Sequence, residues 1–373
     1  MKNRFLKSMI VFVASLVFVA GCGSDDDSGA TDDAMATTTA DSTDDSAATT
    51  TGESTECVEN TGEQLTVYSG RSEDLISPLF DSFTCATGVD LRVRWESSTD
   101  LAVLINEEGS ATEADVFLSR SPGPVGFLEA EGHLAVLDDE VLELVEPEFR
   151  SAAGTWVGFS GRKRVLVSNL DTVADDELPA SVFDLTGDTY EGRVAIPATN
   201  GSFEDWFTVL RSEVGDEAAT QWLADMVANN ARYYPDNRSI VDAVARGEID
   251  MGLVNHYYNY QEVAVRGDEH RAQNVDFEGG DVGSVVIITA ATALESSEKQ
   301  DLANQFIAHL LTPESQQFFT DETFEYPLVE GVTPNTALPP LEFGGVGSVD
   351  FDALGGGFTE TEQIIQESGI LNQ

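Results

Sequence analysis

From residue 64 onward, strand-like and helix-like segments alternate, and this alternation constrains the fold more than any other feature of the chain. Residues 65–68 and 89–95 have the apolar, alternating composition of strands, and residues 75–84 between them have the apolar spacing of a helix. A second helical pattern at 101–106 leads to a short apolar strand pattern at 114–117. A βαβαβ order of this kind predicts a parallel sheet with helices on both faces.

The same alternation returns in the second half of the chain, so we expect two α/β units. Residues 156–169 form one strand pattern long enough to run from one unit into the other, and residues 285–289 form the pattern of a returning strand. Two such crossings predict a hinged, two-lobed α/β body with a central cleft. The other later elements are expected as strands at 193–196 and 250–254 and as helices at 203–212, 217–229, 240–245 and from about 257.

The two crossings also set the predicted lobe boundaries. The N-terminal lobe is expected to comprise residues 64–161 plus about 284–338, and the C-terminal lobe residues 162–283 plus about 339–373. A chain of 373 residues with 41% hydrophobic side chains is long and apolar enough to build both.

The charge of the chain excludes one large class of partners. It carries 67 acidic side chains against 19 Lys and Arg, for a formal net charge of −48. Nucleic acids and anionic membrane surfaces are bound through positively charged faces. We therefore expect neither nucleic-acid binding nor attachment to a membrane through a basic patch.

The N-terminus has the pattern of a lipoprotein export signal over residues 1–22. Three basic residues precede an apolar stretch at 9–20, and the run Val-Ala-Gly-Cys that ends at Cys22 resembles a bacterial lipobox. In such signals the cysteine is acylated and becomes the mature N-terminus. The alternative is a short transmembrane anchor, for which the apolar stretch is short.

Residues 23–63 are predicted to form a disordered acidic tether. They hold 12 acidic and no basic side chains and almost no large apolar ones, so they cannot bury enough surface to offset the entropy of ordering. Together with lipidation at Cys22, this predicts an extracytoplasmic protein anchored to the cell membrane. In an exported protein the remaining pair, Cys57 and Cys85, suggests a disulfide from the end of the tether to the first helix, although two independent thiols would also fit.

Several short motifs in the folded part resemble, in their order and spacing, the bacterial ferric-ion-binding proteins. These are the extracytoplasmic solute-binding subunits of iron(III) ABC importers. The resemblance covers about residues 64–370 and implies a periplasmic-binding-protein-like fold, Fe(III) as the bound solute, an ABC permease as partner and a monomer in solution. The motifs are LTVYSGR at 65–71, ADVF at 114–117, SGRKRV at 160–165, TNGSF at 199–203, LVNHYY at 253–258 and EYPL at 325–328, together with Asn237.

The resemblance implies that Tyr257 and Tyr258 ligate Fe(III). Fe(III) is a hard cation, a phenolate is a hard anionic donor, and the charge of the metal removes the phenol proton despite a free pKa near 10. Two tyrosines at the start of a helix can both reach a cleft. The alternative is an aromatic pair packed in the core or lining a pocket that holds no metal.

The family often completes the metal shell with a synergistic anion, phosphate or carbonate, and this chain has matching positions. The loop before the helix near residue 203 offers backbone N–H groups and a helix dipole to such an anion. The plainer alternatives are that Asn200-Gly201 is only a turn, that Asn237 is only a helix N-cap and that Arg71 is only in a surface ion pair. The matching positions are Arg71, Asn200, Gly201, Ser202, Asn237 and Asn255.

The chain also departs from the family pattern. One subgroup uses a His and a Glu where this chain has Ser72 and Arg120, and another uses a third tyrosine where it has Phe203. Two phenolates, an anion and water would then make up the shell. His256 and Tyr68 are spare cleft candidates, each with a structural role as the alternative.

Three further arginines are expected near the cleft. Arg162 and Arg164 lie on the predicted crossing strand, where they could line the cleft or pair with acids near the hinge. Arg120 would place positive charge opposite the tyrosines and favour an anionic ligand or an iron–anion complex.

Three functions compete at this point. The first is a lipoprotein that captures ferric iron and docks on a permease. The second, motivated by Ser72, Arg120 and Phe203, is a protein of the same fold for an organic or oxyanion solute such as a polyamine, a thiamine derivative or a phosphonate. The third is a cell-surface hydrolase, but no histidine lies in a nucleophile or metalloprotease motif, so we do not expect an enzyme.

Overall fold

The computed structural model describes residues 57–341 and 357–373. The predicted signal peptide, Cys22 and residues 23–56 of the predicted tether lie outside the described residues. The last part of that segment, residues 57–63, belongs to the folded body: a disulfide joins Cys57 to Cys85, and the N–H of Val58 donates to the carbonyl of Cys85 at 2.9 Å. The tether prediction is therefore too long at its C-terminal end, because this disulfide and these backbone bonds hold residues that their polar composition alone would leave unfolded.

The described strands form one nine-stranded sheet in the order β2-β1-β3-β9-β4-β7-β5-β6, with β8 paired to β4. Neighbours β1, β2 and β3 are parallel, and so are β5, β6 and β7, as the βαβ pattern predicts. The strands are β1 (Gln64–Ser69), β2 (Asp90–Trp95), β3 (Val116–Ser119), β4 (Val157–Asn169), β5 (Val194–Ile196), β6 (Arg232–Tyr233), β7 (Met251–Asn255), β8 (Ala272–Val275) and β9 (Val286–Ala293).

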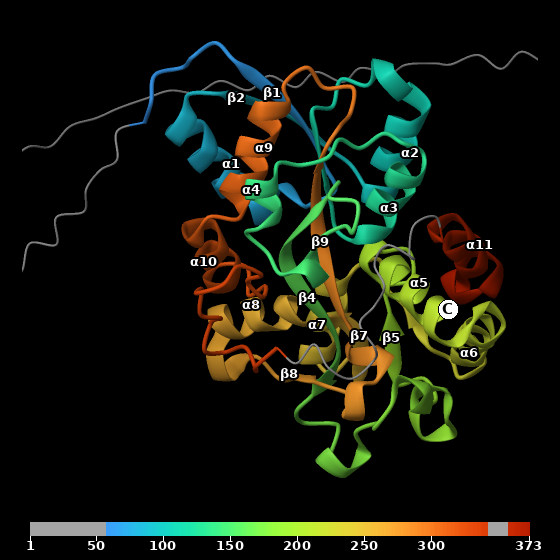
Figure 1. The fold of residues 1–373 in the computed structure, drawn as a ribbon. Coiled ribbons are helices and arrows are strands. Elements are labelled where there is room, and N and C mark those ends of the chain that lie inside the picture. The colour runs from blue at the N-terminus through green and yellow to red at the C-terminus, as the bar shows by residue number, and fades with distance from the viewer. Residues whose placement is uncertain (1–56, 342–356) are drawn as a thin grey trace, which may run out of the picture. The chain divides into compact units, whose positions relative to one another are not determined.

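Two long strands, β4 and β9, connect the two parallel groups and lie side by side between them in Figure 1. The first half of β4 pairs antiparallel with β9, from Val157 opposite Ala291 to Lys163 opposite Val286. Its second half pairs with β7 and β8, while the end of β9 pairs with β3. These are the two crossing strands expected from residues 156–169 and 285–289.

Helices cover the sheet, and their ends follow local sequence signals. The first helix ends at Gly88, whose φ of 73° is the left-handed conformation that glycine adopts without strain. None of the described helices is long and apolar enough to cross a membrane. The helices are α1 (Glu73–Thr87), α2 (Ser98–Glu108), α3 (Pro122–Ala130), α4 (Asp139–Leu142), α5 (Gly201–Val214), α6 (Asp216–Ala228), α7 (Asn237–Ala245), α8 (His256–Arg266), α9 (Gln300–Leu310), α10 (Pro313–Asp321) and α11 (Phe358–Ser368).

The buried apolar side chains gather in separate clusters that change over within the crossing strands. One cluster runs from residue 65 to Phe159 and resumes at Ile288, whereas two others occupy residues between Val165 and Ile287. The second cluster also includes Ile365 of α11, and α11 packs against α5 and α6 (Figure 1). The strands β4 and β9 are thus the elements shared by both cores.

Candidate functional site

Two adjacent tyrosines begin helix α8, where β7 ends at Asn255. Tyr257 is 2% exposed, and its ring centroid lies 4.3 Å from that of Tyr258. Burial raises the pKa of Tyr258 well above its usual range, the neighbouring Tyr257 phenol adds to the increase, and Arg71 and Arg120 act against it. A bound cation would offset this cost, because a metal charge favours the phenolate form.

The arginine Arg71 forms a buried ion pair beside the tyrosines. It lies just after β1, and its Nη2 donates to Oε1 of Glu325 at 2.7 Å, with both side chains almost fully buried. Burial alone would lower the pKa of Arg71, but Glu325 and the two tyrosines outweigh it and hold that pKa above its ordinary value. Arg71 is thus a fixed cation in the site rather than a member of a surface ion pair.

Strand β4 contributes two further buried arginines, Arg162 and Arg164. Arg162 Nη2 lies 3.8 Å from Oδ2 of Asp205 on α5. Arg164 donates to Oδ1 of Asn237 at 3.2 Å and to the carbonyl of Ser202. Burial, and next the charge of Arg162, lowers the pKa of Arg164 to about 9, so it is still cationic at neutral pH.

Most side chains predicted to bind an anion are bonded to one another at the start of α5. Oδ1 of Asn200 accepts from the N–H of Ser202 at 3.1 Å, from its hydroxyl at 2.7 Å and from Nδ2 of Asn237 at 3.1 Å. Asn237 Oδ1 in turn accepts from the N–H of Asn255 at 3.0 Å. These side chains hold the N-terminus of α5 in place, and Asn200 is its N-cap. Asn237 does not cap α7, because Asp236 does so.

Residues 120 and 121, which follow β3, lie against the first turn of α5. The Arg120 guanidinium fills the space beside Gly201, where any Cβ would collide with it. Ser121 donates its hydroxyl proton to Oδ1 of Asp205 at 2.6 Å. The site therefore brings together side chains from the segments just after β1 and β3 and from β4, α5 and α8.

Several buried polar atoms around the tyrosines have no hydrogen-bond partner among the described residues. Such atoms are rare in folded proteins and mark places where a ligand, ion or water completes the structure. The donors outnumber the acceptors, so the site is suited to an anion as well as to a cation held by phenolates. The atoms are Nε of Arg71, Arg120 and Arg162, Nδ2 of Asn255, Oε2 of Glu325 and Oδ2 of Asp205.

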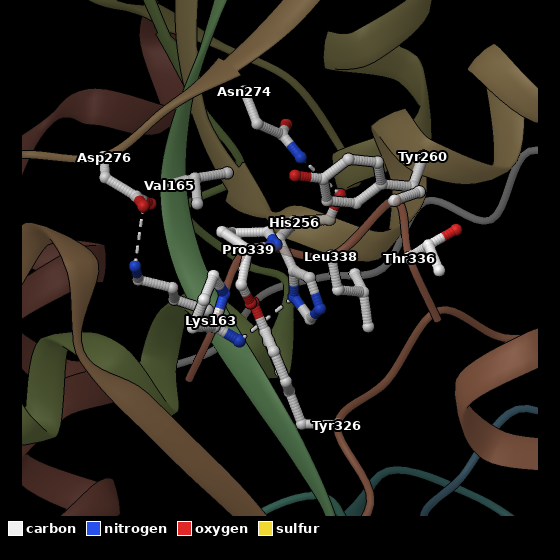
Figure 2. A pocket seen from close by; sticks show the side chains of 12 residues that line it. Lys163, Val165, His256, Tyr260, Asn274, Asp276, Tyr326, Thr336, Leu338 and Pro339 are labelled. Atoms are coloured by element: carbon white, nitrogen blue, oxygen red, sulfur yellow. Dashed lines mark hydrogen bonds and ion pairs between the residues drawn. The ribbon is translucent and has the colours of Figure 1, made fainter. Parts of the chain in front are cut away.

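The structure corrects the two spare cleft candidates. His256 faces a cavity of about 530 Å³ with Lys163, Tyr260, Asn274 and Tyr326 (Figure 2), its Nδ1 accepts from the N–H of Lys163 at 3.1 Å, and its ring stacks on Tyr326. Burial lowers the pKa of His256 to about 3, which keeps the ring neutral. Its ring also meets that of Tyr257 edge-on, with the two centroids 5.7 Å apart, so His256 packs beside the tyrosine pair.

Tyr68 is occupied elsewhere as well. Its hydroxyl lies 3.5 Å from Glu108 of α2, and the guanidinium of Arg94 sits over its ring. Phe203, at the position of a third tyrosine in some relatives, is fully buried among aromatic rings, and Ser72 is exposed at the start of α1. The described residues hold no group of three His, Cys, Asp or Glu side chains that could bind a metal.

Sequence reasoning missed the two carboxylates of the site. Glu325 enters the sequence analysis only as the first residue of the EYPL motif, yet its side chain is fully buried against Arg71. Asp205 was not considered. A cluster of buried arginines requires counter-ions, but with 67 acidic residues in the chain the sequence offers no signal that selects these two.

A third acid near the site, Glu204, should make the stability of the folded protein depend measurably on pH. Burial is the main cause that raises the pKa of Glu204 from 4.5 to about 8. Repulsion from Asp205, Glu362 and Asp100 also raises this pKa, whereas the charge of Arg120 lowers it. Between these values the folded protein binds more protons than the unfolded chain, so its stability falls as the pH rises, with a slope of at most about 1.4 kcal/mol per pH unit.

Glu204→Gln should remove this contribution and make the variant relatively more stable at pH 8 than at pH 5. Urea unfolding at both pH values measures it. An unchanged difference between the variant and the parent at the two pH values would show that Glu204 ionises normally.

The two crossing strands and the enclosed polar site between elements of both cores define a solute-binding protein of the α/β type. The family model described as bacterial extracellular solute-binding protein matches residues 111–343. The chain belongs to this family, and the fold class expected from the sequence is confirmed.

The relatives of the chain agree with the predicted resemblance. It is 30% identical over 311 residues to the Fe(3+)-binding periplasmic protein of Serratia marcescens, covering 82% of this chain and 90% of that protein. It is also 30% identical over 280 residues to the major ferric iron-binding protein of Neisseria gonorrhoeae, covering 74% and 84%.

Solved structures give the same result. Iron-bound HitA from Pseudomonas aeruginosa superimposes with a TM-score of 0.77 at 31% identity, covering 82% of this chain and 99% of that one. A Trichodesmium protein in complex with iron and citrate has a TM-score of 0.68 at 25% identity, with coverage of 82% and 99%.

Proposed function

We propose that this protein captures ferric iron outside the cytoplasmic membrane and delivers it to the permease of an ABC importer. One observation carries the proposal: the buried phenol of Tyr257 and the partly buried phenol of Tyr258 lie among arginines whose Nε–H groups have no partner in the described part of the chain. A trivalent metal would turn both phenols into phenolates, and the arginines would hold an accompanying anion. The iron-binding relatives support this reading.

In this proposal Tyr257 and Tyr258 are the protein ligands of Fe(III). The synergistic anion, phosphate or carbonate in the simplest case, sits between Arg71 and the start of α5 at Gly201, within reach of Nδ2 of Asn255. Asn200, Ser202, Asn237 and Arg164 support that helix start rather than bind the anion themselves. Two lobes that meet at β4 and β9 would close on the iron and open to release it.

The test is a titration of the metal-free protein with a ferric salt, followed by visible spectroscopy. Phenolate-bound iron gives a charge-transfer absorption, so a coloured one-to-one complex is expected. A colourless protein would favour the second function, an organic or oxyanion solute, for which the surplus of arginines is the supporting observation. Mass spectrometry of the small molecule that co-purifies then identifies the solute.

We also propose that a lipid on Cys22 anchors the mature protein, with residues 23–56 as a polar spacer. Cys22→Ser should move the protein from the membrane fraction to the soluble fraction without changing iron binding, since the proposed iron ligands Tyr257 and Tyr258 lie far along the chain from Cys22. Cell fractionation with immunoblotting measures this. Equal membrane association of the variant and the parent would contradict lipid anchoring at this residue.

A further inference from the structure

We infer that the cavity of Figure 2 is a second binding site, for a neutral ring-shaped organic molecule that carries the hydrogen-bond donor and acceptor of an amide. The inference does not depend on the proposed ferric function. The volume of the cavity, about 530 Å³, lies within the range of roughly 300–1,000 Å³ for pockets that hold small organic molecules. Its lining residues lie on β4 and α8, in and just after β8, and beyond α10.

The cavity and the tyrosine site lie on opposite sides of the crossing strand β4. Successive side chains of a strand point to opposite faces, so neighbouring residues of β4 belong to different sites. Two other chain segments are divided in the same way. The pairs of neighbours, with the residue that lines the cavity first, are Lys163 with Arg162, His256 with Tyr257 and Tyr326 with Glu325. A molecule in the cavity would therefore not occupy the place of the iron.

Two buried polar atoms of the cavity residues have no hydrogen-bond partner among the described residues. Asn274 donates through Nδ2 to the carbonyl of His256 at 2.8 Å, so its Oδ1 is a free acceptor. His256 accepts through Nδ1 from the N–H of Lys163 at 3.1 Å, so Nε2 of the neutral ring carries the proton and is a free donor. The backbone of Phe324 acts on the His256 ring but makes no hydrogen bond of normal geometry with Nε2. An amide group satisfies one such donor and one such acceptor together.

The charges around the cavity favour a neutral molecule. Among the described residues that line it, Lys163 and Asp276 alone are charged, and their side chains form an ion pair at 2.7 Å. This pair leaves no net charge in the lining. A charged ligand would lose its hydration in the cavity without gaining a counter-ion, which is costly. The arginine cluster on the other side of β4 has the opposite preference, for an anion.

The remaining walls of the cavity are apolar or aromatic, which suits a ring. Val165, Leu338 and Pro339 contribute apolar surface (Figure 2). The ring of Tyr326 stacks on that of His256, with the two centroids 5.1 Å apart. Apolar walls with a few polar groups that fix orientation are typical of small-molecule sites. We therefore expect an aromatic or heterocyclic amide.

The experiment uses benzamide as the probe and compares it with benzoate and benzylammonium, which have the same ring. Benzamide has both a donor and an acceptor, benzoate has acceptors and a negative charge, and benzylammonium has donors and a positive charge. Each compound is titrated into the metal-free protein and followed by ligand-observed NMR. We expect benzamide to bind with a Kd of about 1 mM or lower, and each charged analogue to bind in the cavity at least about 10-fold more weakly.

Variants assign the binding to the cavity. Thr336→Trp places a large ring at the exposed rim and should abolish benzamide binding, and only binding that this variant removes is assigned to the cavity. Asn274→Leu removes the free acceptor and should weaken benzamide binding about 10-fold. Thr189→Trp is the matched control, because Thr189 is exposed and is not among the residues that line the cavity. Thermal unfolding of each variant checks that it is folded.

Benzamide that does not bind, or that binds Thr336→Trp as tightly as the parent protein, would overturn the inference. Cavity binding of benzoate or benzylammonium as tight as that of benzamide would also overturn it, because the site would then select a charged ligand. All of these measurements are made without iron, so their failure is distinguishable from a failure of the ferric titration, which tests the proposed function.

Discussion

Tyr257→Phe and Tyr258→Phe should each lower ferric-iron affinity by more than about 100-fold. Loss of a residue that only supports a metal ligand costs up to about 100-fold, and each of these changes removes a ligand itself. The ring remains, so the packing of the pair at 4.3 Å is kept and the fold should survive. Only the oxygen that becomes a phenolate is lost. The charge-transfer absorption should weaken in each single variant and disappear in the double variant.

Tyr260→Phe is the matched control on the same helix. Tyr260 lies two residues beyond Tyr258, but it faces the cavity of Figure 2 with His256 rather than the arginine cluster. Its variant should keep the parent's iron affinity and spectrum. Equal losses in all three variants would mean that the helix as a whole, rather than the phenol pair, is responsible for binding.

Glu325→Leu should lower the free energy of unfolding by about 3–5 kcal/mol, since it leaves the guanidinium of Arg71 buried without its carboxylate. Both side chains are almost fully removed from water, so solvent cannot replace the lost charge. Urea unfolding at neutral pH measures the change. A loss below about 1 kcal/mol, as for an exposed ion pair, would contradict the buried pair.

The double variant Arg71→Met/Glu325→Leu separates stability from binding. Replacing both partners with apolar groups of similar size removes the unpaired charge, so most of the stability should return. Anion-dependent iron binding should not return, because Arg71 supplies one of the cations of the site. A double variant that binds iron as tightly as the parent protein would show that Arg71 does not hold the anion.

The elements with a regular apolar pattern could be predicted closely. The strand expected at 156–169 is β4 at Val157–Asn169, and the helix expected from about 257 is α8 from His256. Apolar periodicity encodes both directly. The helix boundaries were less accurate, since α1 runs two residues further at its start and three at its end than its apolar stripe, through positions whose side chains are partly exposed.

The site could be predicted only in part. The adjacent tyrosines stand out in the sequence, and in the structure the charges of Arg71 and Arg120 act on Tyr258, while Tyr257 acts on Arg162. The pairing of Arg71 with Glu325 joins residues 254 positions apart and has no local pattern. Side-chain contacts were equally hidden: the ring of His256 accepts a hydrogen bond from the N–H of Lys163, stacks on Tyr326 and meets the ring of Tyr257 edge-on.

The anion residues illustrate a different limit. Asn200, Ser202 and Asn237 were expected to face an anion, but their side chains form hydrogen bonds with one another and with Arg164. A sequence motif can report that a loop is built for a ligand without reporting which of its atoms are free to bind. Here the free donors belong largely to arginines from other elements.

The metal content of the protein purified from its native cells, without added iron or chelator, tests the central claim most directly. We expect about one iron atom per chain, a coloured preparation and loss of both in the Tyr257→Phe/Tyr258→Phe variant. A native protein that carries no iron, stays colourless on ferric titration and holds an organic solute instead would contradict it.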